Sequence, residues 1–382
     1  MRKIALAVGL CACSNHSGAK ADAGGTADGP PSVDAAMADA GPDAPPVFPP
    51  FMLPAAGVDV LFVIDNSLSI TDKQVAFASS FASFVAGLDA LPGGRPDVHI
   101  GFVSTTVGLD SDANYGTSCP NTAPADDGLL HATATVTGCT PPSGLFISDI
   151  ASSNSRTTNY TGTLDQAMTC IAELGQRGCG FEEPLEAMKR ALDGSQTANA
   201  GFVRDGAALL VVIFTDEDDA SIADPAIFDL QNVGGLSDFR AQPMYAYDCN
   251  VPITATPDPA TYTGCTPRTG SYLRDTGSYV DFLTSIKDPS LIQVAVIAGG
   301  QQDGSPPSST ISTGSVLIPG QSTSQDPALE PTCQFTLDAM TEIARPGIRL
   351  LDFTQRLSGH GTFSTICTAD YSSTLTAIAG AL

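Results

Sequence analysis

The amino-acid sequence predicts an α/β fold, namely one doubly wound, mainly parallel sheet with helices on both faces. Two unbroken apolar runs, 60–64 and 209–214, have the length and the branched side chains of strands that are buried on both faces. Segments of helical length, with apolar residues three and four apart, follow such strands along the chain. Because strands alternate with helices, we expect a parallel sheet that binds ligands at the carboxyl ends of its strands.

The first predicted unit is a strand, a polar turn and a helix. The strand 60–64 runs into Asp65, and the helix begins near Thr71, which has capping-box spacing to Gln74. A Pro-Gly-Gly sequence at 92–94 ends this helix. The remaining strands are predicted at 98–103, 209–214 and 292–297, and the remaining helices at 164–171, 185–192, 279–286, 336–343 and 374–382.

Three stretches near 108–160, 220–275 and 300–332 interrupt this alternation. They are rich in Pro, Gly, Ser and Thr. We interpret them as insertions in loops, where added length costs little free energy. The sequence therefore predicts one domain over 56–382 that carries three long insertions.

The N-terminal residues have the pattern of export and lipidation. Arg2 and Lys3 precede a short apolar stretch, as in a signal peptide, and this stretch is shorter than the roughly 20 residues that span a bilayer. Leu-Cys-Ala-Cys at 10–13 resembles a bacterial lipobox, in which the small Ala12 makes Cys13 a better lipidation site than Cys11. We therefore expect a signal peptide with lipobox over 1–13 and secretion across the inner membrane.

The segment 14–55 is predicted to be a disordered tether. It is dominated by Ala, Asp, Gly and Pro, and such a composition cannot bury enough apolar surface to offset the entropy of ordering. Ser14, rather than Asp, follows Cys13. By resemblance to sorting in two-membraned bacteria, this favours an outer-membrane lipoprotein of the cell envelope, attached to the membrane through its lipid.

The charge argues against nucleic acid as a partner. The formal net charge is −24, with only 17 Lys and Arg residues, whereas a surface that binds phosphates must be basic. An acidic surface attracts cations, but this alone selects no function.

Eight cysteines follow the lipobox. An even number behind a secretion signal predicts disulfides in an oxidising compartment. A zinc site is disfavoured, because there are no CxxC pairs in this region and the four His residues are scattered. Loop position favours the pairs Cys119–Cys139, Cys170–Cys179, Cys249–Cys265 and Cys333–Cys367.

Two of the buried strands run directly into carboxylates. Asp65 ends the first and begins the stretch DNSLS, and Asp216 follows the strand 209–214 within the stretch TDEDD. Asp, Asn and Ser are common in turns for local reasons. Their repetition at the ligand-binding edge of the predicted sheet favours a site instead.

The stretch DNSLS resembles the DxSxS signature of von Willebrand factor A domains, and Thr215-Asp216 matches a second motif of that family in the expected order. The resemblance covers about 56–382. It implies a metal-ion-dependent adhesion site in which Asp65, Ser67, Ser69 and Asp216 surround a divalent cation. It also implies a protein ligand or envelope component whose carboxylate completes the shell. Oxygen ligands of this kind suit Mg²⁺, with Mn²⁺ and Ca²⁺ as alternatives.

The third family motif supplies a Thr before a helix, but the stretch GCGFEEPLEAM at 178–188 has no Thr or Ser. Matching the helix through Met188 places Glu182 there as a carboxylate ligand. Matching it through Leu185 places Cys179 there, and Glu183 is a further alternative. These acids could instead only favour the helix N-terminus. A carboxylate ligand neutralises more of the cation and leaves it a weaker attractor of an external carboxylate.

Catalytic motifs are absent from the sequence. We find no GxSxG, no GxxxxGK and no GxGxxG after a strand, and Asp65 has no second Asp two residues on. We therefore expect no catalytic residues and a cation-binding protein that is not an enzyme. The alternatives are a structural envelope protein whose cation only stabilises the fold, and a metal-dependent hydrolase. The acids at 217–219 are expected to form a solvated rim.

Overall fold

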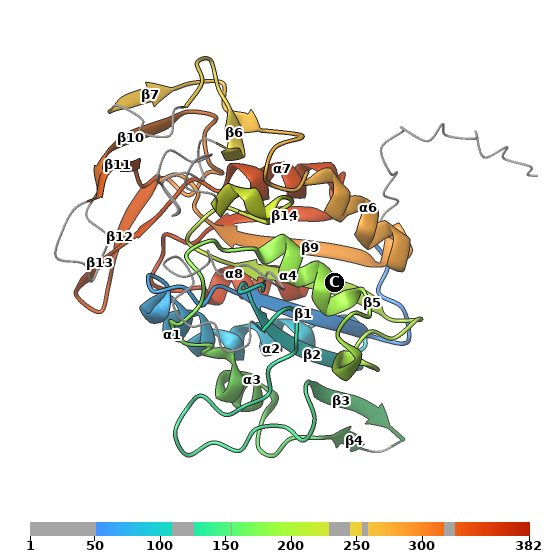
Figure 1. Ribbon diagram of the computed structural model, residues 1–382. Helices are drawn as coiled ribbons and strands as arrows, with labels where there is room; N and C mark the ends of the chain where they lie inside the picture. Colours follow the sequence, from blue (N-terminus) through green and yellow to red (C-terminus); the bar gives the residue numbers. More distant parts are fainter. Residues whose placement is uncertain (1–50, 109–125, 154, 229–244, 254–258, 317–324) are drawn as a thin grey trace, which may run out of the picture. The chain divides into compact units, whose positions relative to one another are not determined.

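The computed structural model describes residues 51–108, 126–153, 155–228, 245–253, 259–316 and 325–382 (Figure 1). The chain divides into two units, Met1–Ala44 and Pro45–Leu382, and all described residues belong to the second. The predicted signal peptide, Cys13 and nearly all of the tether lie outside the described residues. Within the described part, none of the helices has the length and apolar character needed to cross a membrane.

The central sheet has seven strands in the order β14-β9-β5-β1-β2-β3-β4. Five of them pair in parallel, whereas β3 and β4 are antiparallel to their neighbours. The predicted α/β fold with a mainly parallel sheet is confirmed. The strands are β1 (Val58–Ile64), β2 (Val98–Ser104), β3 (Ile147–Ser152), β4 (Ser155–Thr158), β5 (Ala208–Phe214), β9 (Ile292–Ala298) and β14 (Gly361–Thr365).

Helices cover both faces of this sheet (Figure 1). Alternate residues of β1 point to opposite faces, so Phe62 packs in the core with α1, α2, α3 and α8, while Leu61 packs in the core with α4, α6 and α7. The helices are α1 (Thr71–Ser79), α2 (Phe81–Asp89), α3 (Leu164–Ala172), α4 (Pro184–Leu192), α6 (Gly277–Ile286), α7 (Ile348–Arg356) and α8 (Ser372–Gly380).

The predicted insertions contain short strands. The first insertion is not only a loop, because it supplies β3 and β4 to the central sheet. The second and third insertions meet in one small sheet, where β7 pairs with β10. The remaining elements are β6 (Tyr247–Asp248), β7 (Ala260–Tyr262), β8 (Thr266–Pro267), β10 (Ile311–Val316), β11 (Gln325–Leu329) and the 3-10 helices η2 (Thr197–Asn199), η3 (Pro225–Phe228) and η4 (Pro289–Leu291).

The predicted helix at 336–343 is wrong. This segment forms the hairpin of β12 (Cys333–Leu337) and β13 (Met340–Ala344), which turns at Asp338 and Ala339 with φ of 47° and 66°. A short apolar pattern does not separate strand from helix, and here cross-strand pairing decided. The α7 and β14 elements that follow were not predicted, since Arg349 and other polar residues interrupt the apolar pattern of α7.

The predicted first helix is divided at Ser80 into α1 and α2, and its capping box does not form. Thr71 Oγ1 donates to Gln176 Oε1 at 2.8 Å. The side-chain nitrogen of Gln74, Nε2, donates to the backbone carbonyls of Asp65 and Gly175. Gln74 therefore braces the polar turn after β1 instead of capping the helix.

Three disulfides join described cysteines. Two follow the predicted pairing, Cys249–Cys265 and Cys333–Cys367, and the third is Cys139–Cys170. The predicted pairs of Cys119 with Cys139 and of Cys170 with Cys179 are therefore wrong. The loop before Cys139 packs on the end of α3, where Thr135 N donates to Cys170 O at 2.8 Å. Cys179 is also disulfide-bonded, and Cys119 lies outside the described residues.

Candidate metal centre

The candidate site lies where the order of strands in the sheet reverses. From β1 the chain continues to β2, β3 and β4 on one side and then returns to β5 on the other side (Figure 1). Asp65 N donates to Phe214 O at 2.9 Å, and Thr105 N donates to Ile64 O at 3.2 Å. The carboxyl ends of β5, β1 and β2 therefore lie side by side, at the point where α/β sheets bind ligands.

Four of the five predicted ligand residues form one continuous polar cluster. Asp65 accepts from Ser67 N at 2.7 Å and from Thr215 Oγ1 at 2.9 Å. Ser67 Oγ and Ser69 Oγ are 3.3 Å apart, and Ser69 Oγ donates to Asp216 Oδ1 at 3.1 Å. The two sequence motifs, which are about 150 residues apart, thus meet through their side chains.

Glu182, the fifth predicted ligand residue, precedes α4, and its charge interacts with those of Asp65, Glu217 and Asp216. Its side chain is buried, and its Oε2 has no hydrogen-bond partner in the described structure. Burial raises the pKa of Glu182 well above its ordinary value, and the nearby carboxylates of Asp65, Glu217 and Asp216 raise it further. Glu183, the alternative, instead accepts from Ile222 N at 2.8 Å. Of the two acids, Glu182 is therefore the one whose charge interacts with those of Asp65 and Asp216 and whose Oε2 has no hydrogen-bond partner among the described residues.

The loop that carries Glu182 packs directly on the polar turn. Gly178 N donates to Asn66 O at 2.7 Å, and Thr106 Oγ1 donates to Asn66 Oδ1 at 2.8 Å. A Cβ atom at Gly178 would lie only 2.2 Å from Asn66 Oδ1. Glycine at this position therefore allows the close approach of the two loops.

A buried lysine borders the site, and sequence reasoning did not find it. Lys73 on α1 donates from Nζ to Ser69 O at 2.9 Å, to Asp216 Oδ2 at 2.9 Å and to Glu342 Oε2. Burial lowers the pKa of Lys73, but the charges of Asp216 and Glu342 outweigh it and hold the pKa above its ordinary value. Lys73 therefore stays charged and ties the β12–β13 hairpin to the site.

The expected solvated rim at 217–219 is wrong, because all three side chains are buried. Glu217 pairs with Arg345, Asp218 accepts from the backbone N–H groups of Arg349 and Leu350 at the start of α7, and Asp219 accepts from Arg349. These acids compensate buried arginines and a helix N-terminus, which a local sequence pattern does not reveal.

The donor set fits a hard divalent cation. Several buried carboxylates lie close together at the site. Burial, and then the charge of Asp216, raise the pKa of Asp65 to about 8. Burial also raises the pKa of Glu217 to about 7, although Arg345 lowers it. Adjacent ligands of octahedral Mg²⁺ are about 3.0 Å apart, since each lies about 2.1 Å from the ion. The Ser67–Ser69 and Ser69–Asp216 oxygen distances of 3.3 and 3.1 Å are close to this spacing.

Carboxylates alone do not make this site. Among the described residues, no group of three or more His, Cys, Asp and Glu side chains is arranged to hold a metal ion. The fit therefore depends on the hydroxyl groups of Ser67 and Ser69. These are neutral oxygen ligands that suit Mg²⁺.

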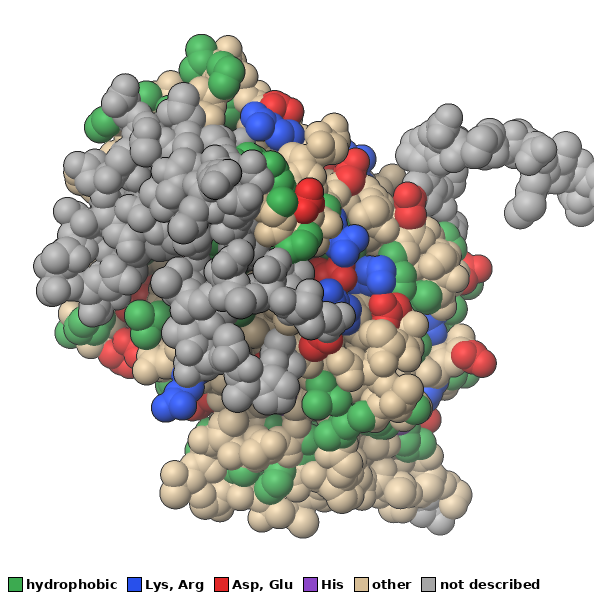
Figure 2. Space-filling model, viewed as in Figure 1, with side chains coloured by type: hydrophobic (Ala, Val, Ile, Leu, Met, Phe, Trp, Pro, Cys, Tyr) green, Lys and Arg blue, Asp and Glu red, His purple; other side chains and the backbone are tan. Residues whose placement is uncertain are grey.

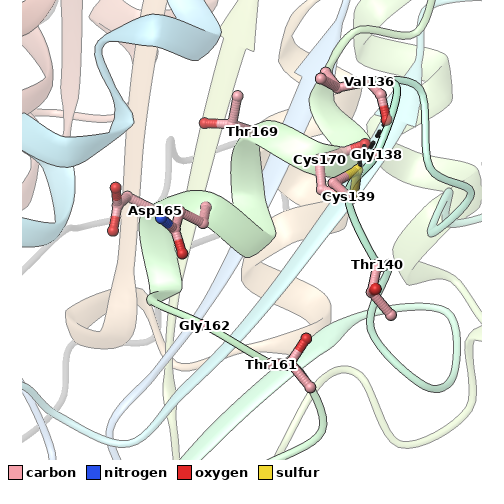
Figure 3. Close-up of a pocket in the computed structure, with 10 residues that line it drawn as sticks. Val136, Gly138, Cys139, Thr140, Thr161, Gly162, Asp165, Thr169 and Cys170 are labelled. Carbon is pink, nitrogen blue, oxygen red and sulfur yellow. Dashed lines mark hydrogen bonds between the residues drawn. A yellow bond between two sulfur atoms is a disulfide. The ribbon is translucent and has the colours of Figure 1, made fainter.

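A separate pocket with a volume of about 460 Å³ opens at the start of α3, beside the Cys139–Cys170 disulfide (Figure 3). Threonines and glycines line it, together with Asp165 on α3. No lining residue carries a buried polar atom without a partner. In contrast to the cluster at the strand ends, this pocket offers no set of convergent ligands.

No family model matches the chain, and no curated protein matches it. Among solved structures it is similar to a secreted C11 cysteine protease from Bacteroides thetaiotaomicron, in complex with an irreversible peptide inhibitor. The match has a TM-score of 0.23 and 8% identity, and it covers 64% of this chain and 43% of the protease chain.

The prediction that this chain is not an enzyme is contradicted, because a solved structure that the chain matches is that of a protease. At this TM-score and identity the match assigns no activity to the chain.

Proposed function

We propose that this protein is a von Willebrand factor A-like protein of the cell envelope, lipid-anchored through Cys13, that binds Mg²⁺ and, through it, a carboxylate of a protein ligand. The observation that carries the proposal is the continuous cluster of Asp65, Ser67, Ser69 and Asp216 at the switch in strand order. The unpartnered, buried Glu182 Oε2 supports it, because a cation would satisfy this oxygen.

In this proposal Ser67, Ser69 and Glu182 ligate the cation, and Asp65 and Asp216 bind it or hold its waters. The bound cation attracts the carboxylate of the partner. The chain's own contribution is preorganisation, because Asp65 is held by Ser67 N and the Thr215 hydroxyl before any cation binds. Preorganised ligands lower the entropy that binding must offset.

A second candidate function is a structural cation that only stabilises the fold. It is favoured by burial, since the side chains of Asp65, Glu182 and Asp216 are at most 2% exposed. Access for a partner would have to come through the turn itself, where Ser69 is half-buried and Leu68 is 58% exposed. The two candidates differ in whether the bound cation keeps an exchangeable position.

The first test is Mg²⁺ binding by the full chain, measured by isothermal titration calorimetry. Wild type is expected to bind, and Asp65→Asn is expected not to. Asparagine has the shape of aspartate without its charge, and burial, which raises the pKa of Asp65 to about 8, already disfavours that charge. The control is Asp193→Asn, whose carboxylate pairs with Lys189 on the surface. No binding by wild type, or unchanged binding by Asp65→Asn, would contradict a cation site at this cluster.

The second test separates adhesion from a purely structural cation. Bound Mn²⁺ with an exchangeable inner water enhances the relaxation of bulk water protons, whereas a fully enclosed ion does not. We expect enhancement that exceeds that of free Mn²⁺ and that is absent in Asp65→Asn. Binding of Mn²⁺ without enhancement would rule out an open position and leave the structural candidate.

A further inference from the structure

We propose that Thr105, the residue that follows β2, is a further ligand of the same cation, which it binds together with Glu182. This inference rests on the proposed cation site. It adds a residue that no sequence motif marks, and it locates the cation on the side of Asp65 that faces β2 and the start of α4.

The first observation is an unsatisfied hydroxyl. Thr105 is 1% exposed, and its Oγ1 is fully buried without a hydrogen-bond partner among the described residues. A buried hydroxyl without a partner costs about 1–3 kcal/mol. Such groups are rare in native proteins, and each calls for an explanation such as an ion or a water molecule.

The second observation is its position beside Asp65. Ile64 pairs with Ser104 and also with Phe214, so Asp65 has Thr105 on one side and Thr215 on the other. Laterally paired residues project from the same face of a sheet. The hydroxyl of Thr215 is satisfied, because it donates to Asp65 Oδ2 at 2.9 Å, whereas the hydroxyl of Thr105 on the opposite side is not.

The third observation is a second unsatisfied oxygen, on the neighbouring chain segment. Thr105 O accepts from Glu183 N at 3.1 Å, so the segment that carries Glu182 runs directly along Thr105. The unpartnered Glu182 Oε2 belongs to a side chain whose charge interacts with Asp65. Hydroxyl and carboxylate oxygens are both ligands for a hard cation, so one ion bound between these two segments would satisfy both.

The test compares two substitutions at Thr105 in the full chain. Thr105→Val keeps the shape and removes the hydroxyl, whereas Thr105→Ser keeps the hydroxyl. We expect Thr105→Val to weaken Mg²⁺ binding on the order of 10–100-fold, the range seen when groups around a metal are removed. Thr105→Ser should stay within a few-fold of wild type. Binding is measured by isothermal titration calorimetry.

Stability without Mg²⁺ serves as the control. Because Thr105→Val removes an unsatisfied buried hydroxyl, its urea midpoint in chelator should equal or exceed that of wild type. A merely structural hydroxyl would give the opposite result, a lower midpoint that Thr105→Ser restores, and this would overturn the inference.

Each remaining outcome of these measurements supports or overturns the inference. If wild type and Thr105→Val bind Mg²⁺ equally, a trapped water satisfies the hydroxyl and the inference fails, while the proposed function stands. If wild type binds no Mg²⁺, both proposals fail. Weaker binding by Thr105→Val with an unchanged or higher urea midpoint supports the inference.

Discussion

Replacing Lys73 with Met tests how the site is held together. Lys73 is fully buried, and its ammonium lies between the carboxylates of Asp216 and Glu342, whose side chains are 2% and 6% exposed. Methionine has a similar length and no charge. The substitution therefore leaves two buried carboxylates without their counter-charge.

The expected magnitude follows from this burial. Removing one partner of a buried ion pair costs about 3–5 kcal/mol, chiefly because the remaining charge is left uncompensated. For a domain of this size a loss of 1 kcal/mol lowers Tm by about 2 °C. Lys73→Met should therefore unfold about 6–10 °C below wild type when both are in chelator.

A matched control exists on the surface of the same protein. Lys189 pairs with Asp193 at 2.7 Å, but Lys189 is 36% exposed. Such pairs contribute about 0–1 kcal/mol. Figure 2 shows Lys, Arg, Asp and Glu side chains intermingled over the region where Figure 1 places α4 and α6. Lys189→Met should therefore lower Tm by no more than about 2 °C.

Mg²⁺ is expected to act more strongly on Lys73→Met than on wild type. In wild type the ammonium already neutralises Asp216, so it repels an incoming cation. Without it, the cation is the remaining compensation for this carboxylate, and the Mg²⁺-dependent rise in Tm should be larger. The measurement is thermal unfolding followed by circular dichroism, in chelator and in excess MgCl₂.

Two results would refute this reasoning. Equal losses of Tm in Lys73→Met and Lys189→Met would show that the buried pair carries no special weight. Equal rises with Mg²⁺ in wild type and Lys73→Met would show that the ammonium and the cation do not compete for Asp216.

Two further predictions concern pH and the packing of the loops. Burial lowers the pKa of His99 below its ordinary 6.5, and Arg204 lowers it further, although Phe202 O and Asp59 oppose the shift. Below pH 6.5 the unfolded chain therefore binds more protons than the folded one, and the free energy of unfolding falls as the pH drops. His99→Gln should lose less stability than wild type between pH 7.5 and 5.5 in urea titrations, and identical pH dependence would contradict this assignment. Gly178→Ala should lower the free energy of unfolding by about 1–3 kcal/mol, since the new Cβ overlaps Asn66, and should weaken Mg²⁺ binding by displacing the turn. Gly206→Ala, where the nearest atom is 3.5 Å from the added Cβ, is the control, and equal Mg²⁺ affinities in the two variants would show that the loop contact does not position the site.

Local sequence patterns predicted the main strands and most of the helices. The strands β1, β2, β5 and β9 are continuous apolar runs, because both faces of a central parallel strand are buried. The β12–β13 hairpin was mistaken for a helix, since its conformation depends on pairing across the turn at Asp338 and Ala339. Disulfide pairing also depended on which loops pack together, and loop position along the chain gave the wrong partner for Cys139.

The residues of the candidate site also fall into two groups: those that the sequence alone identified and those that only the structure revealed. Asp65, Ser67, Ser69 and Asp216 could be named from the sequence alone, because they lie in the DNSLS and TDEDD stretches after two buried strands, which match the motifs of the resemblance, and each has an oxygen side chain that suits a hard cation. Lys73 and Thr105 could not. Lys73 reaches the site from a helix, and its partner Glu342 lies 269 residues away in sequence. Thr105 becomes a candidate only when its hydroxyl is seen to be buried without a partner. The sequence therefore determined which groups offer oxygen ligands. The tertiary structure decided their charge compensation and their unsatisfied hydrogen bonds, since both depend on contacts between segments far apart in the chain.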